Sequence, residues 1–210
     1  MIPELVRTWG AGWAVSRSTP PPAERPWGLY IEVGYPGQVG RHVLSDAHES
    51  SVRAAADSVT APHTWLKVPR EPEVVGHWLP EGWVVDKDEA GYLMAVDLQA
   101  TDPVAPEGYS ASVETRDGVV YAGVRDTAGE VVAKGQMAVL GRAVVVDRVG
   151  TDEAHRRRGL GAFVMRTLTD HAVARGAALG VLGATPDGRA LYEALGWKVH
   201  APLAACIYRP

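Results

Sequence analysis

The chain has little that would tie it to a membrane, a nucleic acid or an oxidising compartment. Its 210 residues include one cysteine, Cys206, so an internal disulfide is excluded and a reducing cytoplasm is expected. No apolar run approaches the roughly 20 residues that cross a bilayer. The start, Met1-Ile2-Pro3-Glu4, lacks the basic and apolar regions of a secretory signal. We therefore expect a cytoplasmic protein with no membrane partner.

The chain also has no large excess of either positive or negative charge. The formal net charge is −4, which predicts no nucleic-acid partner and weakly favours a cationic substrate. Hydrophobic residues make up 46% of the chain, enough to build a packed core in one large domain or two small ones. Because Cys206 lies in an apolar stretch, we interpret it as a buried thiol and not as a nucleophile.

Pattern divides the chain into four segments. Residues 1–27 begin with apolar positions at helical spacing and end in a proline-rich connector, 28–98 form an α/β unit, 99–108 a linker, and 109–210 a second α/β unit. Trp9 and Trp13 allow two interpretations, packing on a neighbouring domain or stacking on a ligand, of which packing is the commoner.

The expected elements follow from capping residues, turns and periodicity. Asp46 and Glu49 form a capping-box pattern that predicts a helix over 46–58. Asp117-Gly118 predicts a two-residue hairpin. Other expected helices cover 72–79, 159–175 and a segment capped by Thr185, and expected strands cover 29–33, 39–44, 64–68, 83–85, 92–98, 109–115, 119–124, 130–140, 143–149 and 178–184, with 197–199 and 203–208 as a last pair.

The most informative stretch joins an apolar strand to a helix through His155-Arg156-Arg157-Arg158-Gly159-Leu160-Gly161-Ala162. Gly159 and Gly161 carry no side chains, so backbone N–H groups at the positive end of the helix dipole stay accessible. Such donors suit a pyrophosphate, and the three arginines add charge that neutralises it. The alternative is a tight turn with a solvated basic cap.

A second motif, Leu191-Tyr192-Glu193-Ala194-Leu195-Gly196-Trp197, follows some thirty residues later. In this order and spacing the two motifs resemble the signatures of the GNAT superfamily of acetyl-CoA-dependent N-acetyltransferases, and the resemblance covers about residues 108–210. It implies an α/β (α+β) fold with a mixed, mostly antiparallel sheet flanked by helices. It also implies acetyl-CoA as cosubstrate, no metal, and a small-molecule or peptide amine as acceptor.

The resemblance further implies roles for individual residues. Backbone N–H groups of Val149, Gly150 and Thr151 would receive the thioester carbonyl, and Tyr192 would be the general acid. Thr185 stands where relatives often have asparagine, which puts a side-chain hydrogen bond to the pantetheine arm in doubt. The residues expected to hold the cofactor are Val149, Gly150, Thr151, Arg156, Arg157, Arg158, Gly159, Leu160, Gly161, Ala162 and Thr185.

The general base is less clearly indicated. Asp147 is the only carboxylate in the strand before the loop, and a carboxylate buried there needs a partner. It could serve as the base or pair structurally with Arg148 or Arg142. His155 has a suitable pKa but lies on the phosphate side of the loop, where a surface or phosphate contact is the better interpretation. Glu114 and His77 remain alternatives that nothing in the sequence separates.

The two halves of the chain are similar in element order. Placing Gly82-Trp83 on Gly196-Trp197, an offset of 114 residues, aligns the helices and strands of both halves. The first half lacks the glycine-rich basic loop, so we interpret it as a degenerate GNAT-like half joined to an active one. The second half lacks the helix pair that the family places after its first strand. The first half, or its tryptophans, must supply that wall.

Together these features predict an N-acetyltransferase that acts by direct transfer to a primary amine, since Cys206 lies away from both motifs and cannot carry the acyl group. The alternatives are a transferase of another acyl group or onto a protein amine, and a non-catalytic CoA-binding regulatory module. RNA or phosphate binding has only Arg156 to Arg158 in its favour. The acceptor is not identified, and a homodimer is one option for the oligomeric state.

Overall fold

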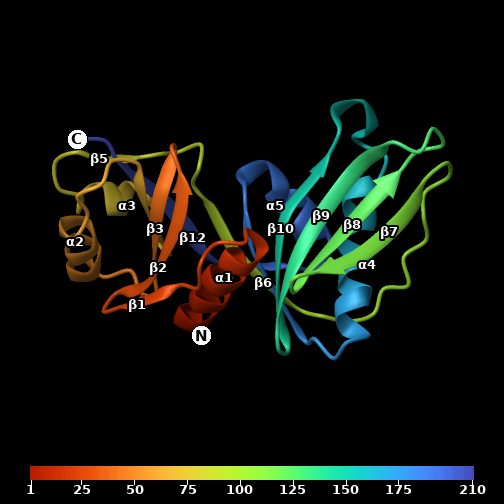
Figure 1. Ribbon diagram of the computed structural model, residues 1–210, viewed down its shortest axis with the longest axis horizontal. Coiled ribbons are helices and arrows are strands. Elements are labelled where there is room, and N and C mark those ends of the chain that lie inside the picture. Colours follow the sequence, from red (N-terminus) through yellow and green to blue (C-terminus); the bar gives the residue numbers. More distant parts are fainter.

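The computed structural model describes residues 1–210, which form two lobes on either side of one helix (Figure 1). The first lobe contains β1 (Ala23–Arg25), β2 (Gly28–Tyr35), β3 (Gln38–Leu44), α2 (Glu49–Asp57), β4 (Thr64–Val68), α3 (Pro72–Gly76) and β5 (Trp83–Val85). The second contains β6 (Gly91–Asp97), β7 (Ser110–Arg116), β8 (Val119–Arg125), β9 (Val131–Leu140), β10 (Ala143–Thr151), the 3-10 turn η1 (Glu153–His155), α4 (Leu160–Val173), β11 (Leu179–Ala184) and α5 (Pro186–Ala194). The last strand, β12 (Lys198–Tyr208), belongs to both lobes.

The strands form a continuous sheet in the order β1-β2-β3-β4-β12-β6-β11-β10-β9-β8-β7, and β5 pairs with β12. Most pairs are antiparallel. The two parallel pairs, β3 with β4 and β10 with β11, are each joined through a crossover helix, as parallel neighbours require. A mixed, largely antiparallel sheet flanked by helices was expected, and the structure confirms it.

The two lobes exchange strands. Residues 198–203 of β12 pair with β6 in the second lobe, and residues 204–208 pair with β4 and β5 in the first. In return β6, which follows the first lobe in sequence, is inserted between β11 and β12. The sequence-based boundary at residue 98 differs from this hydrogen bonding, which places 91–97 in the second lobe.

The order of elements repeats. An antiparallel hairpin, a crossover helix, a parallel strand, a second helix and a further strand occur as β2-β3-α2-β4-α3-β5 and as β9-β10-α4-β11-α5-β12. At the offset of 114 residues, β5 corresponds to the start of β12 and β6 to its end. This repetition supports the interpretation of two related halves, which remains an interpretation.

The helix α1 (Ile2–Ser16) lies between the lobes (Figure 1). It covers one face of β9, β10 and β11 and also touches β2 and β3. Gly12 explains how close it comes, because a Cβ on this residue would lie 2.2 Å from Val145 Cγ2. The glycines at positions 10 and 12, which weaken helix propensity, thus allow α1 to dock. Helix α1 supplies the wall that the second lobe was expected to need.

The central strand β10 is covered on both faces, as its apolar sequence predicts. Val144 and Val146 join the core under α4, together with Val164 and Leu168, whereas Val145 joins a second core under α1. A third core lies between helices α2 and α3 and the part of the sheet that belongs to the first lobe. It contains Cys206, which is buried as expected. Layered cores on both faces of the sheet hold the two lobes in one body.

Two local expectations were wrong. The helix α2 begins at Glu49 with His48 as its N-cap, and the Asp46 carboxylate accepts from the His48 N–H at 3.2 Å, so no capping box forms. The last pair of strands is instead the single strand β12, which continues through Pro202 because it changes partners from β6 to β4 at Leu203 and Ala204. None of the helices combines the length and the apolar character needed to span a bilayer.

Candidate active site

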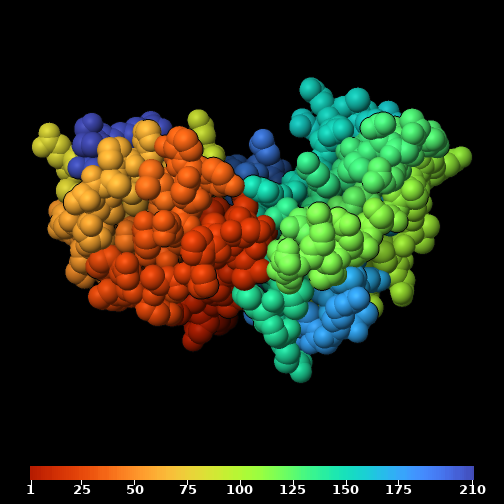
Figure 2. Space-filling model, in the orientation of Figure 1, coloured from red at the N-terminus to blue at the C-terminus, as the bar shows by residue number.

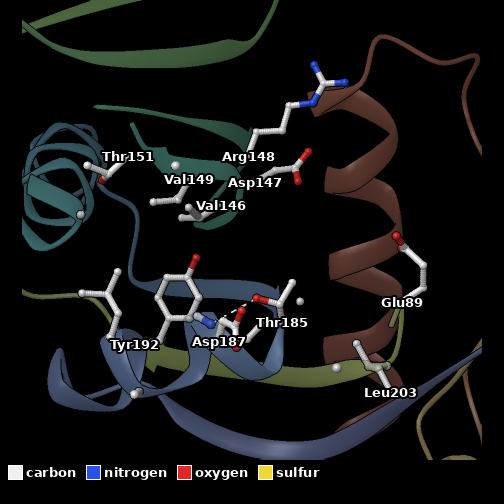
Figure 3. Close-up of a pocket in the computed structure, with 18 of the residues that line it drawn as sticks. Glu89, Val146, Asp147, Arg148, Val149, Thr151, Thr185, Asp187, Tyr192 and Leu203 are labelled. Carbon is white, nitrogen blue, oxygen red and sulfur yellow. Dashed lines mark hydrogen bonds between the residues drawn. The ribbon is translucent and has the colours of Figure 1, made fainter. Parts of the chain in front are cut away.

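A cavity of about 980 Å³ lies between the lobes, where Figure 2 shows the surface hollowed above α5. It begins at the N-terminus of α4, passes between β10 and the start of α5, and reaches α1 and the first lobe. Figure 3 shows Val149 and Thr151 on one side of it, Tyr192 and Thr185 on another, and α1 closing a third. The cavity therefore joins residues from both halves of the chain.

The cavity opens because β10 and β11 separate. The two parallel strands pair only from Ala143–Leu179 to Val145–Val181, and beyond that point they diverge. On its other edge β10 has a bulge between Asp147 and Gly150, and Arg148 there adopts a positive φ of 52°. A bulge turns the strand and changes the direction of its backbone groups. Residues 149–151 line the cavity, and pairing of β10 with β9 resumes after the bulge at Gly150 and Thr151.

The N-terminus of α4 forms one end of the cavity. Gly159 caps the helix with φ of 79°, a conformation that favours glycine, and no atom lies within 4 Å of the position its Cβ would take. The first helical N–H to find a carbonyl is that of Phe163, which donates to Gly159 O at 3.0 Å. The preceding N–H groups of Leu160, Gly161 and Ala162 have no carbonyl within the helix, so they can receive an anion.

The other loop residues differ in what they face. Arg156 and Arg157 line the cavity, whereas Arg158 does not and donates instead to the Tyr109 hydroxyl at 3.0 Å. Gly161 has a packing role that the sequence did not indicate, because a Cβ there would lie 3.0 Å from Leu191 Cδ2 of α5. Of the two glycines in the motif, only Gly159 faces open space.

Tyr192 lies on α5 with its hydroxyl directed at the strand β10 (Figure 3). Burial and the nearby Asp147 carboxylate raise the pKa of Tyr192 to about 12, so the phenol stays protonated at neutral pH. Thr185 caps α5 as expected, its hydroxyl accepting from the Gly188 N–H at 3.1 Å, with Pro186 at the first turn. Both side chains line the cavity.

Asp147 lies at the junction of β10 and α1. Its carboxylate is held by Arg17, whose Nη2 lies 2.8 Å from Oδ1 and whose Nε lies 2.5 Å from Oδ2, and it accepts from the Ser16 hydroxyl at 3.0 Å. Ser16 is in turn bonded to Gln136 of β9. The sequence offered Arg148 and Arg142 as partners, and neither is correct, because the actual partner lies 130 residues away. Both oxygens of the Asp147 carboxylate are therefore engaged by residues at the end of α1.

The far part of the cavity contains buried cations. Arg41 of β3 and Lys67 of β4 are only 7% and 6% exposed, and together with Arg17 we call them the cation cluster. The Arg41 guanidinium stacks on Trp13 at 3.9 Å, and Arg17 lies 5.1 Å from the same ring. Lys67 Nζ donates to Glu89 O at 2.8 Å and lies 3.8 Å from the Glu89 carboxylate.

Burial dominates the electrostatics of these cations. It lowers the pKa of Arg41 to about 9, assisted by the charge of Arg17, and lowers the pKa of Lys67 to about 7, assisted by the charge of Arg41. The charge of Arg17 therefore lowers the pKa of Arg41, and the charge of Arg41 lowers the pKa of Lys67. The cavity is also lined by the carboxylates of Asp88, Glu89, Asp147 and Asp187, and the sequence-based expectation of a cationic substrate stays a prediction.

Most residues predicted from the sequence meet in this cavity. Asp147, Tyr192 and all the expected cofactor residues except Arg158 line it, and so does His155. Two alternative bases lie elsewhere, since Glu114 pairs with Arg116 on an exposed strand, and His77, the C-cap of α3, bonds through its ring to the Glu73 carbonyl. Trp9 and Trp13 pack in the core and also line the cavity.

The residues that sequence reasoning missed are Arg17, Arg41, Lys67 and Glu89. One signal was present, because Arg41 and Lys67 each lie beside apolar residues in a short strand, Gln38–Leu44 and Thr64–Val68. A fully buried charged side chain is rare unless a group of opposite charge or a hydrogen-bond partner accompanies it. The sequence does not show that the side chains of Arg41 and Lys67 face the cavity, because that depends on where α1 packs.

Comparisons with known proteins agree with this geometry. A sequence model of the acetyltransferase (GNAT) family matches residues 87–197, just over half of the chain. A search of curated protein sequences found no match. Among solved structures, a GCN5-related N-acetyltransferase from Kribbella flavida is 18% identical with a TM-score of 0.66, covering 97% of this chain and 95% of that one.

Two further structures extend the likeness. A GNAT-family chain from Novosphingobium aromaticivorans is 18% identical with a TM-score of 0.63 and covers 98% of each chain. A tandem GNAT protein from the clavulanic acid biosynthesis pathway is 13% identical with a TM-score of 0.57, covering 77% of this chain and 68% of that one. At these identities the structural likenesses show the fold alone.

Proposed function

Because the chain belongs to the acetyltransferase (GNAT) family, we propose that it transfers the acetyl group of acetyl-CoA directly to a primary amine. One observation carries the proposal: a single cavity connects the N-terminus of α4 with Tyr192 and with the cation cluster. The N-terminus of α4 would bind coenzyme A, Tyr192 would lie beside the reacting atoms, and the cation cluster would lie beside the acceptor.

The helix N-terminus provides the anion site. Leu160, Gly161 and Ala162 offer backbone N–H groups, and Arg156 and Arg157 add positive charge beside them. Together they match the diphosphate of coenzyme A. The bulged end of β10 then lies where the thioester carbonyl would receive a hydrogen bond from residues 149–151.

The reaction forms a C–N bond and breaks a C–S bond. The amine lone pair attacks the thioester carbonyl, and the tetrahedral intermediate collapses as coenzyme A leaves as a thiolate. With its pKa near 12, Tyr192 holds its proton and donates a hydrogen bond to the departing sulfur. Tyr192 then gives its proton to the thiolate sulfur and takes up the proton that the amine nitrogen loses, so coenzyme A is released as the thiol and Tyr192 ends as a neutral phenol.

The amine must be neutral before it attacks. Asp147 is occupied by Arg17 and Ser16, so we assign it the task of orienting Arg17 and not that of a base. The cation cluster itself disfavours an ammonium ion nearby, which lowers the pKa of a bound amine. Electrostatic repulsion by Arg17, Arg41 and Lys67 thus supports a neutral nucleophile.

The anion site is tested by Gly159→Leu, measured by isothermal titration with acetyl-CoA. We expect at least tenfold weaker binding because the side chain enters the open space of the site, a change of about 1.4 kcal/mol or more. Gly141→Leu is the matched control, since Gly141 also has a positive φ, 62°, and nothing within 4 Å, but lies in the β9–β10 turn away from the cavity. Unchanged affinity in folded Gly159→Leu would contradict the assignment.

The acid role is tested by Tyr192→Phe in a thiol-release assay. We expect kcat to fall by roughly 10²- to 10⁴-fold, as for the loss of a general acid, with the acetyl-CoA dissociation constant unchanged. Normal turnover would remove Tyr192 from the mechanism. If the wild-type protein binds acetyl-CoA but releases no thiol with any amine, the direct-transfer proposal fails and a CoA-binding module takes its place.

A further inference from the structure

Within the cation cluster, Arg41 is the one residue that no carboxylate contacts directly. Arg17 is matched by Asp147, and Lys67 has the Glu89 carboxylate at 3.8 Å. No carboxylate lies within 4.0 Å of the Arg41 guanidinium, although it is only 7% exposed. With the Gln38 amide turned so that its oxygen faces Arg41, Nε and Nη2 both donate to it at 2.8 Å. That neutral partner leaves Arg41 without a direct ion pair, and the carboxylates of Glu89 and Asp147, which are paired with Lys67 and Arg17, act on it only from a greater distance.

Burying the charge of Arg41 without a direct ion pair costs free energy, and this cost calls for an explanation. A buried charge without an opposite charge is strongly disfavoured, and natural proteins pair such groups or bind ions with them. Stacking on Trp13 offsets part of the cost. The remainder is consistent with a site built for an anion that arrives from outside the chain, since Arg41 faces the cavity.

Lys67 adds to the same site. Its Nζ is held from behind by Glu89 O at 2.8 Å, and the Glu89 side chain is 61% exposed, so this carboxylate screens Lys67 only partly. Arg41 and Lys67 come from neighbouring strands, β3 and β4, which are paired in parallel. Both line the wall of the cavity that the first lobe contributes.

We propose that the acceptor amine carries an anionic group, a carboxylate or a phosphate, which binds to Arg41 and Lys67. The inference rests on the function proposed above and names its substrate class. With Nε and one N–H of Nη2 donating to Gln38, the N–H groups of Nη1 and the second N–H of Nη2 remain for two oxygens of one anion, and the lysine adds a point charge beside them. Within the cavity the anion-binding residues lie in the first lobe and Tyr192 in the second, so the amine would extend from one lobe toward the other.

The first experiment is an acceptor screen with acetyl-CoA and thiol detection. It compares amino acids with their amides, for example glycine with glycinamide, and phosphoethanolamine with ethanolamine. We expect at least one anionic amine to have a kcat/KM roughly tenfold or more above its neutral partner, because a charge-assisted hydrogen bond is lost in the latter. The two pairs also distinguish a carboxylate from a phosphate.

The second experiment applies Arg41→Met to the preferred pair. We expect KM for the anionic amine to rise about 10- to 100-fold, and the ratio of kcat/KM for the anionic amine to kcat/KM for its neutral partner to fall by a similar factor. Arg41→Lys keeps the charge but not the fork and should recover only part of the affinity. Arg53→Met, on the exposed face of α2, is the control that should leave both substrates unchanged. If Arg41→Met does not fold, as melting would reveal, Lys67→Met replaces it with the same expectation.

The outcomes separate the two proposals. Absence of thiol release with every amine, despite acetyl-CoA binding, contradicts the proposed function itself. Release that is equal for acids and amides, or that favours neutral or cationic amines, leaves the transferase function standing and overturns the anionic acceptor. The same holds if the acid preference survives in folded Arg41→Met and Lys67→Met.

Discussion

The ion pair between Arg17 and Asp147 connects single residues of α1 and β10. The Asp147 side chain is 13% exposed and accepts hydrogen bonds from two of the three guanidinium nitrogens of Arg17. Removal of Arg17 would leave the carboxylate with Ser16 as its remaining partner. Breaking a buried pair in this way costs more than the pair contributes, because one charge stays behind without compensation.

We therefore expect Arg17→Met to lower the free energy of unfolding by about 2 kcal/mol, somewhat below the range for fully buried pairs because Arg17 is partly exposed. Urea denaturation followed by tryptophan fluorescence measures the change. Arg53→Met breaks the exposed pair with Glu49 and should cost under about 0.5 kcal/mol. Equal effects of the two substitutions would show that the Arg17 pair has no structural role.

Lys67 makes stability and substrate binding depend on pH. Burial lowers its pKa in the folded protein to about 7 from 10.5, so between these values the unfolded chain binds the extra proton. Stability contributed by Lys67 therefore rises with pH from about 7 to 10.5, and below 7 the full cost of the buried charge is present. In the same range the lysine loses the charge that would attract an anion.

Lys67→Met should consequently be more stable than the wild type at pH 6, and this advantage should shrink as the pH approaches 10. Urea midpoints across that range measure it. For an anionic acceptor, kcat/KM of the wild type should contain a decrease centred near pH 7 that Lys67→Met lacks. Parallel stability curves for the two proteins would contradict the lowered pKa of Lys67.

At the scale of elements, α1 packs on the second lobe through Gly12 and on the first lobe through Gly10. A Cβ at position 12 would meet Val145 Cγ2 at 2.2 Å, whereas one at position 10 would lie 3.2 Å from Leu29 Cδ1. The first overlap requires the helix to move, and the second only a small adjustment of a flexible side chain.

Gly12→Ala should therefore lower the free energy of unfolding by roughly 1–3 kcal/mol, although alanine favours a helix by about 1 kcal/mol. Gly10→Ala, the matched control, should change stability by less than about 1 kcal/mol. Chemical denaturation of both variants provides the measurement. Greater stability of Gly12→Ala would mean that α1 does not pack on Val145 as closely as the structure has it.

Elements governed by local rules could be predicted from the sequence. The strands 64–68 and 83–85 and the cap at Thr185 appear at the expected positions, because alternation, turns and capping involve neighbours in sequence. The start of α2 was misplaced by three residues because Asp46 bonds to the backbone just before the helix. The parts that escaped prediction depend on distant pairings, notably Arg17 with Asp147 and β6 with β11.

The site divides in the same way. The glycine and arginine loop and Tyr192 belong to contiguous motifs, so sequence reasoning could place them together. The cation cluster joins α1, β3 and β4 with β10, and no spacing within the sequence relates Arg17 to Arg41 or Lys67. Such residues become visible only when the elements that carry them are packed.

At the scale of the whole molecule, the exchanged strands join the lobes. The second lobe needs β6 between β11 and β12, and the first lobe needs the end of β12 beside β4. Neither half contains all of its own sheet. A break in the exposed connection near Val104, which is 87% exposed, leaves β6 in the first piece and β12 in the second.

We expect the fragments 1–103 and 104–210 to copurify when they are expressed together and each to remain unfolded alone. Amide proton spectra of each fragment and of the pair are the measurement, and the full chain cut at the same place after folding is the control. A dispersed spectrum from 104–210 alone would show that the second lobe is an independent domain. Unfolding of the intact chain should show coincident transitions by fluorescence and circular dichroism.

The placement of α1 between the lobes also affects how the protein can diverge. The groups that would grip the coenzyme lie after residue 148, whereas Trp13, Arg41 and Lys67, which would select the molecule to be acylated, lie in the first third of the chain. Mutations in one stretch can thus retune selectivity while the other retains its carrier. Coenzyme binding and the choice of acceptor could therefore change independently, because separate stretches of the chain would determine them.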